Sequence, residues 1–115
     1  MPSPEHPDVS SFLPLPAAVF HILVSLATRD AHGYAIMQDV AARAGVKMGP
    51  GTLYTTVRRL LEQGLLVELR SAPDGDTVDP RRRYYQLTPL GRDVARAEAA
   101  RLADLVRQAR AIGLA

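Results

Sequence analysis

Apolar residues recur with a helical period in the first part of the chain. Between residues 16 and 29 nearly every position is apolar, and the polar exceptions are His21, Ser25 and Thr28. Their spacing of four and then three residues places them on one side of a helix. Residues 16–29 are therefore predicted to form a central helix that is buried over most of its surface.

A second amphipathic segment follows a break at residues 30–33. Its inner face is expected to carry Ile36, Met37, Val40, Ala41 and Ala44. Gly45 should end this helix, because glycine readily adopts the left-handed conformation that closes many helices. Residues 46–49 are too few for another element, so the next helix follows directly and the pair predicts a helix-turn-helix.

The third segment has one apolar and one polar face. At about 100° per residue, the apolar side carries Leu53, Val57, Leu60 and Leu61. The opposite side carries Gly51, Thr52, Thr55, Arg58 and Arg59. Hydroxyl and guanidinium groups hydrogen-bond phosphates and base edges in the major groove of DNA. Residues 50–63, ended by Gly64, are therefore predicted to form a DNA recognition helix.

Beyond Gly64 the pattern changes to near-alternation. One side of the extended chain carries Leu65, Val67 and Leu69, and the other carries Leu66, Glu68 and Arg70. This alternation predicts a strand. Residues 72–80 are rich in Pro, Asp and Gly, as turns are, and residues 83–87 are predicted to return as a second strand. The two strands form a β-hairpin, the wing.

Thr88 and Pro89 predict the start of a long C-terminal helix, because threonine caps helices and proline is favoured in their first turn. The helix is expected to continue to about Ile112. Its apolar stripe comprises Leu90, Val94, Ala97, Leu102, Leu105, Val106, Ala109 and Ile112.

This stripe extends about 35 Å, further than a body of this size can cover. We expect the same helix of a second chain to cover it in a two-fold dimer. The expected dimerisation residues are Leu102, Leu105, Val106, Ala109 and Ile112. The pairs Glu98/Arg101 and Asp104/Arg107 are expected on the solvent-exposed side of the helix.

Composition changes this interpretation little. The 115 residues carry a net charge of +2, and Lys47 is the sole lysine among the 14 basic residues. Arginine suits bidentate contacts with phosphate and guanine, but heavy arginine usage also reflects GC-rich codons, and composition does not separate the two.

Other features exclude several classes of protein. No apolar run approaches the roughly 18 residues of a membrane span, and the proline-rich residues 1–14 do not resemble a secretory signal. We expect a flexible N-terminal arm, no membrane partner and a cytoplasmic location. Without cysteine, and with three scattered histidines, the chain is expected to be no enzyme and to hold no catalytic residue, metal or cofactor.

Four short motifs follow one another along the chain: residues 32–36 (HGYAI), 49–54 (GPGTLY), 60–65 (LLEQGL) and 82–91 (RRYYQLTPLG). In this order they resemble the motifs of PadR-like transcriptional regulators. The resemblance covers about residues 15–112. It implies a mainly α (α+β) fold, a winged helix-turn-helix with a two-stranded β wing and a long C-terminal dimerisation helix. The expected units are an arm at 1–14, a DNA-binding domain at 15–88 and a dimerisation helix at 89–115.

The resemblance also implies a homodimer that binds double-stranded operator DNA, usually as a repressor, and is released by a small-molecule effector at the dimer interface. Such effectors are often aromatic. The chain has no Trp and only two Phe, Phe12 and Phe20, so aromatic stacking in that pocket would be poorly supplied.

The expected DNA contacts come from three elements. Arg58, Arg59 and Thr55 should contact DNA from the recognition helix, and Gly51 should let backbone amides approach phosphates. Thr52 is expected either to cap the helix or to contact DNA. The ring of Tyr54 is expected to pack between the two faces of the helix, where its hydroxyl can reach a phosphate.

Tyr34 resembles the family's tyrosine that clamps the DNA backbone, although a structural hydrogen bond explains it equally well. In the wing, Arg82 or Arg83 should contact the DNA backbone, but Glu68 and three aspartates leave the wing without net positive charge. That neutrality keeps open a winged-helix scaffold that binds protein without specific DNA recognition. A small-molecule binder whose DNA-binding half has decayed is a third alternative.

Overall fold

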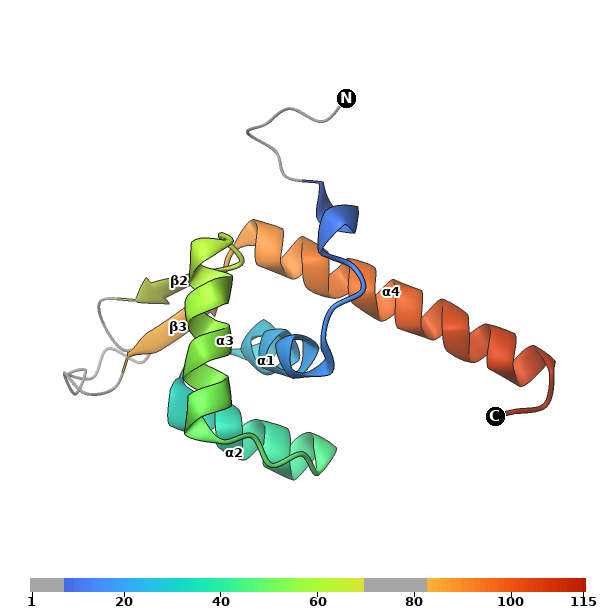
Figure 1. Cartoon of the computed structure of the whole chain (residues 1–115), viewed down its shortest axis with the longest axis horizontal. Helices are drawn as coiled ribbons and strands as arrows, with labels where there is room; N and C mark the ends of the chain where they lie inside the picture. Colours follow the sequence, from blue (N-terminus) through green and yellow to red (C-terminus); the bar gives the residue numbers. More distant parts are fainter. Residues whose placement is uncertain (1–7, 70–82) are drawn as a thin grey trace.

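The computed structural model describes residues 8–69 and 83–115. These residues are mostly helical and include one small β-sheet (Figure 1). The helices are the 3-10 helix η1 (Val9–Phe12), α1 (Ala17–Thr28), α2 (Gly33–Ala44), α3 (Pro50–Glu62) and α4 (Pro89–Ala111). The strands are β1 (Ala31–His32), β2 (Leu66–Leu69) and β3 (Tyr84–Leu87). The predicted mainly α winged helix-turn-helix is confirmed.

The helix ends follow the signals in the sequence. Gly45 adopts a positive φ angle of 68° directly after α2, and Gly64 one of 77° directly after Gln63, the C-cap of α3. The amides of Gly64 and Leu65 donate to the carbonyls of Leu61 and Leu60, which closes α3 in a Schellman motif. Thr88 caps α4, because its hydroxyl accepts a hydrogen bond from the Gly91 amide at 3.0 Å.

The sheet has three strands in the order β1-β3-β2, all antiparallel. β2 and β3 form the predicted hairpin, with Leu66 opposite Leu87. β1 pairs with the other edge of β3 through Ala31 and His32, in the segment that we expected to be only a break. A strand of two residues is too short to produce an alternating pattern, so the sequence alone did not indicate it.

α1 lies in the centre and packs against both α2 and α4. The side chains that are almost fully buried include Ile22, Leu23, Leu26, Ile36, Val40, Leu53, Val57, Leu60, Leu65 and Val94. Two expectations for the core were wrong: Ala41 and Ala44 are exposed, since the inner face of α2 ends at Val40. At the start of the hairpin, Leu65 and Leu66 are both buried and Val67 is 43% exposed, so burial does not follow the alternation of the sequence there.

The polar strip of α1 faces α2. The hydroxyl of buried Ser25 donates to Asp39 at 2.5 Å, and Arg43 donates to the Ser25 hydroxyl at 3.1 Å and to the His21 carbonyl at 3.3 Å. The hydrogen bonds from Ser25 and Arg43 hold the pKa of Asp39 below its usual range. A polar contact therefore joins α1 to α2 beside the apolar core.

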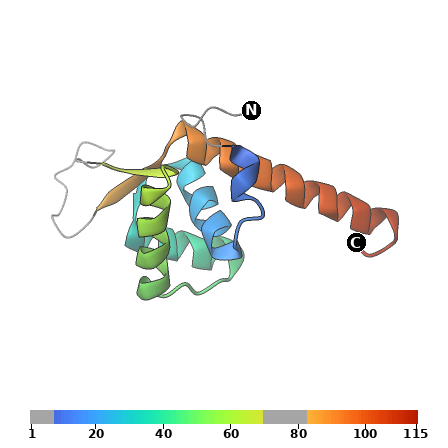
Figure 2. The same ribbon diagram turned by 45° about the horizontal axis from the view of Figure 1, so that its top comes forward.

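Residues 1–7 of the expected flexible arm lie outside the described residues. Residues 8–14 depart from that expectation, because Asp8 caps η1 and both Phe12 and Leu13 pack against the core. η1 lies against α4, as Figure 2 shows for the N-terminal segment in blue.

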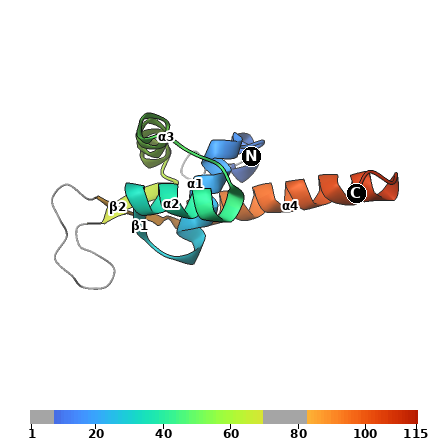
Figure 3. The same cartoon turned by 90° about the horizontal axis from the view of Figure 1, so that it is seen from below.

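α4 extends away from the other helices, with its C-terminal end opposite the hairpin (Figure 3). Its buried residues are Gly91, Val94 and Glu98. Glu98 was expected on the solvent-exposed side, but it is buried and paired with Arg101, whereas the Asp104–Arg107 pair is exposed as predicted. No helix in the described part of the chain is long and apolar enough to span a membrane.

Candidate DNA-binding surface

α3 separates its apolar and polar side chains as its sequence predicts. Leu53, Val57 and Leu60 are buried against the core, while Leu61 is only partly buried. Thr52, Thr55, Arg58 and Arg59 are exposed on the opposite side, together with Gly51. Burial of one face fixes the rotation of the helix, so these polar groups share one outward surface, which we call the α3 surface.

The start of α3 has no side-chain cap. Gly49 occupies the N-cap position and makes no side-chain hydrogen bond, and Pro50 begins the first turn. Thr52 therefore lies inside the helix, and the interpretation of Thr52 as a cap was wrong. Its carbonyl accepts a hydrogen bond from the Thr56 hydroxyl at 2.7 Å. The uncapped first-turn amides point outward and provide donors for an anion.

The two glycines at this helix start have no internal packing role. A Cβ built on Gly49 or Gly51 would meet nothing within 4 Å. Because these two residues have no side chains, the backbone of another molecule can come close to the first-turn amides of α3 from the solvent side.

Arg58 and Arg59 of α3 differ from Arg83 of the hairpin in whether they form an ion pair. Neither pairs with a carboxylate within residues 8–69 and 83–115. Arg83 is exposed but lies 3.5 Å from Glu68 across the hairpin, measured from Nε to Oε1. Arg82 lies outside the described residues. The guanidinium groups on α3 are therefore available to a partner, whereas that of Arg83 is already balanced.

Tyr54 and Tyr34 extend the α3 surface onto the start of α2. Their exposed fractions are 47% and 56%. A Cβ on Gly33 would lie 2.7 Å from the Tyr54 hydroxyl and 2.8 Å from Leu53 Cδ2, so a larger residue there would displace these two side chains of α3. The close approach places the phenol of Tyr54 over the start of α2.

His32 joins this region to the sheet, a role that the sequence did not reveal. Its Nδ1 accepts a hydrogen bond from the Ala35 amide at 3.1 Å and so caps α2, as expected of a residue at a helix start. Its ring stacks with Tyr34 at a centroid distance of 6.5 Å and meets Tyr84 edge-on at 5.3 Å. Tyr84 thus supports the position of Tyr34 through His32.

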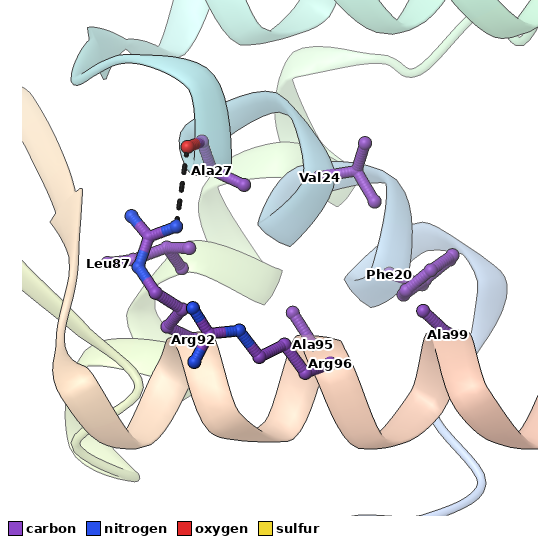
Figure 4. Close-up of a pocket in the computed structure, with 8 residues that line it drawn as sticks. All are labelled: Phe20, Val24, Ala27, Leu87, Arg92, Ala95, Arg96 and Ala99. Atoms are coloured by element: carbon purple, nitrogen blue, oxygen red, sulfur yellow. Dashed lines mark hydrogen bonds between the residues drawn. The ribbon is translucent and has the colours of Figure 1, made fainter.

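A second candidate site is an apolar groove between α1 and α4, with a volume of about 200 Å³ (Figure 4). Phe20, Val24 and Ala27 line it from α1, and Ala95 and Ala99 line it from α4. Arg92 crosses one end and donates to the Ala27 carbonyl at 3.5 Å. Among the described residues, no cluster of His, Asp or Glu could hold a metal ion.

The chain matches the model of the family described as "Transcriptional regulator PadR-like family" over residues 22–97. It is 37% identical over 92 residues to the transcriptional regulator Rv3488 of Mycobacterium tuberculosis, a match that covers 80% of this chain and 81% of that protein.

Solved structures agree with the fold. A PadR family transcription regulator from Clostridium difficile R20291 superposes with a TM-score of 0.69 at 22% identity, covering 84% of this chain and 98% of the other. A PadR family regulator from Eggerthella lenta gives 0.65 at 29% identity, covering 83% and 80%. The chain therefore belongs to the PadR-like family of transcriptional regulators.

Proposed function

We propose that this regulator is a homodimeric repressor that binds operator DNA through the α3 surface and is released by a small-molecule effector. The observation that carries the proposal is the pair of exposed arginines, Arg58 and Arg59, on the face of α3 opposite its buried leucines. Because neither guanidinium forms an ion pair with residues 8–69 or 83–115, none of those pairs has to break before the arginines bind DNA.

Several groups around the two arginines complete the proposed contact. The Thr55 hydroxyl lies on the same face, beside Thr52, and both donate to phosphates or base edges. The uncapped start of α3 at Gly51 receives a phosphate, which the positive end of the helix dipole favours. The phenols of Tyr54 and Tyr34 hold the DNA backbone on the side of α2.

The wing contributes less in this proposal. Arg82 or Arg83 contacts the DNA backbone, but Arg83 shares its charge with Glu68. Sequence recognition therefore depends on α3, with each subunit's helix in a major groove and two half-sites about one helical turn apart.

The dimer is proposed to form through the distal part of α4. Leu105, Val106 and Ile112 are exposed there, while Leu102 and Ala109 are partly buried. Ala95 and Ala99, which line the groove beside α1, continue this stripe toward the body at spacings of three and four residues. In a two-fold antiparallel pair, the large distal side chains of one α4 would face the small alanines of the other.

Replacing Val106 with Asp is expected to convert the dimer to a monomer. Each interface would then bury two carboxylates without partners, which should raise the dimer dissociation constant by roughly 100-fold or more. Sedimentation at micromolar concentration measures the change. Val67→Asp is the matched control, since Val67 is 43% and Val106 45% exposed but only Val106 lies on α4. Equal dimerisation of the two variants would argue against this interface.

The effector is proposed to bind at the dimer interface, where the groove between α1 and α4 opens. Phe20 is the one aromatic side chain among the residues that line it, and Arg92 and Arg96 supply the polar groups. A pocket with this lining favours an apolar ligand with few stacking contacts.

The test of the function is fluorescence anisotropy with a duplex from upstream of the protein's own gene and a scrambled duplex of equal composition, at one near-physiological salt concentration. We expect a preference of roughly 10³-fold or more for the upstream duplex. Equal, weak binding to both, with no sequence enriched from a random duplex library, would contradict specific recognition and favour a winged-helix scaffold that binds protein.

A further inference from the structure

Glu98 is a charged residue at a position where α4 otherwise buries apolar groups. It is 1% exposed and follows Gly91 and Val94 on the buried face of the helix. Beyond it, α4 leaves the body, and Leu105 is already 47% exposed. Burying a carboxylate costs several kcal/mol unless it is paired and hydrogen-bonded, so an apolar side chain would satisfy packing alone at lower cost.

The partners of Glu98 come from two distant parts of the chain. Arg101 donates to both carboxylate oxygens, from Nε to Oε1 at 2.6 Å and from an Nη atom to Oε2 at 3.0 Å. The backbone amide of Leu15 donates to Oε2 at 3.0 Å, across 83 positions of sequence. These hydrogen bonds, those from Arg101 foremost, hold the pKa of Glu98 below its usual range, so the buried group stays ionised.

The Leu15 amide is flanked by two prolines. It lies between Pro14 and Pro16, which have no N–H, so it is the single backbone donor of residues 14–16. Leu15 also packs against the core, next to Phe12 and Leu13. The carboxylate of Glu98 therefore ties the N-terminal segment to α4 at the point where α4 leaves the body.

We propose that Glu98, Arg101 and the Leu15 amide form a clasp in which Glu98 is a positioning residue that fixes the direction of α4 relative to the DNA-binding body. The inference rests on the proposed function, in which α3 contacts DNA and distal α4 joins the subunits. Under that arrangement, the angle at which α4 leaves the body sets the distance between the two recognition helices. The clasp thereby determines which half-site spacing the dimer accepts.

The first experiment measures that distance. Since the chain has no cysteine, Gln63→Cys places one spin label per subunit at the end of α3, and dipolar spectroscopy then gives the intersubunit distance distribution. We expect a narrow distribution with the clasp intact and at least a twofold broader one in Glu98→Gln. Asp104→Asn is the matched control, because it removes another i,i+3 pair of α4, the exposed one with Arg107, and should leave the width unchanged.

A second variant distinguishes loss of the clasp from unfolding of the protein. Glu98→Leu with Arg101→Met replaces the pair with apolar side chains, a change that often preserves stability. We expect a folded protein in which hydrogen exchange of the Leu15 amide is at least tenfold faster, while exchange of the Leu23 amide in the core is unchanged. Unaltered protection of Leu15 would overturn the clasp.

The outcomes separate this inference from the proposed function. If all variants give an intersubunit distance distribution of the same width, the positioning role of Glu98 is wrong, while the dimer stands. If the spin-labelled protein without further substitutions shows no dipolar coupling, the dimer itself is contradicted. The proposed role of the clasp in half-site spacing is then contradicted as well. The exchange of Leu15 would still decide whether the clasp holds the N-terminal segment.

Discussion

Replacing Arg58 and Arg59 together with alanine is expected to weaken operator binding by roughly 100- to 1000-fold, at about 1.4–2 kcal/mol for each arginine. Both side chains are exposed on α3, and neither pairs with a carboxylate in the described residues. Under the proposed function, their removal takes away contacts with DNA and breaks no ion pair among the described residues.

The salt dependence provides a second measure of the same change. Each phosphate contact that is lost reduces the slope of log K against log salt by about 0.9. We expect the double variant to lose about one to two units of slope, depending on whether one arginine contacts a base instead. Anisotropy titrations at several salt concentrations measure both the affinity and the salt slope. The free energy of unfolding, measured by thermal denaturation, should change by less than about 0.5 kcal/mol.

The control removes the same charge elsewhere. Arg107→Ala with Arg110→Ala also removes two positive charges, but from the exposed distal part of α4. If the α3 surface binds DNA, this control should bind the operator nearly as well as the unaltered protein. Equal losses in both double variants would show that the net charge matters and not the position, and the assignment of the α3 surface would be wrong.

The sequence predicted most of the helical framework because its signals there are local. The apolar period fixes the buried faces of α1 and α3, and the positive φ angles of Gly45 and Gly64 appear where a glycine follows the last helical turn. Thr88 and Pro89 begin α4 as their usual helix positions indicate. Each of these features depends on residues within a few positions of one another.

The features that the sequence did not predict depend on distant partners. β1 exists because Ala31 and His32 meet Tyr85 and Tyr84, and Glu98 is buried because Leu15 and Arg101 satisfy its oxygens. The pairing of Glu98 with Arg101, three residues further along α4, was predicted, but its burial was not. Periodicity assigns a glutamate to the solvent side, and the Leu15 amide that also binds this carboxylate lies 83 residues away.

The candidate site shows the same division. Exposure of Thr55, Arg58 and Arg59 follows from the helical period alone. The approach of Tyr54 to Gly33 and the pairing of Arg83 with Glu68 arise only when α2, α3 and the hairpin pack together. Which arginines stay unpaired, and so which can bind DNA at low cost, is therefore a property of the tertiary structure.

Gly91→Ala is expected to destabilise the fold by about 3 kcal/mol or more, the upper end of the cost of overpacking. A Cβ at this position would lie 2.1 Å from the Leu65 carbonyl oxygen, and a backbone atom cannot move aside as a flexible side chain can. Thermal unfolding should show a lower midpoint for Gly91→Ala. Gly51→Ala, whose Cβ meets nothing within 4 Å, should keep or raise the stability by up to about 1 kcal/mol.

The same contact couples the two functional helices. The Leu65 carbonyl accepts the Thr88 amide at 3.1 Å, and the Thr88 hydroxyl donates to the Gly64 carbonyl at 2.6 Å, so the start of α4 is joined to the end of α3. An alanine at Gly91 has to push these two helix ends apart. If Gly91→Ala unfolded at the same temperature as Gly51→Ala, the junction would have room to shift, and α4 would owe its direction to contacts further along its length.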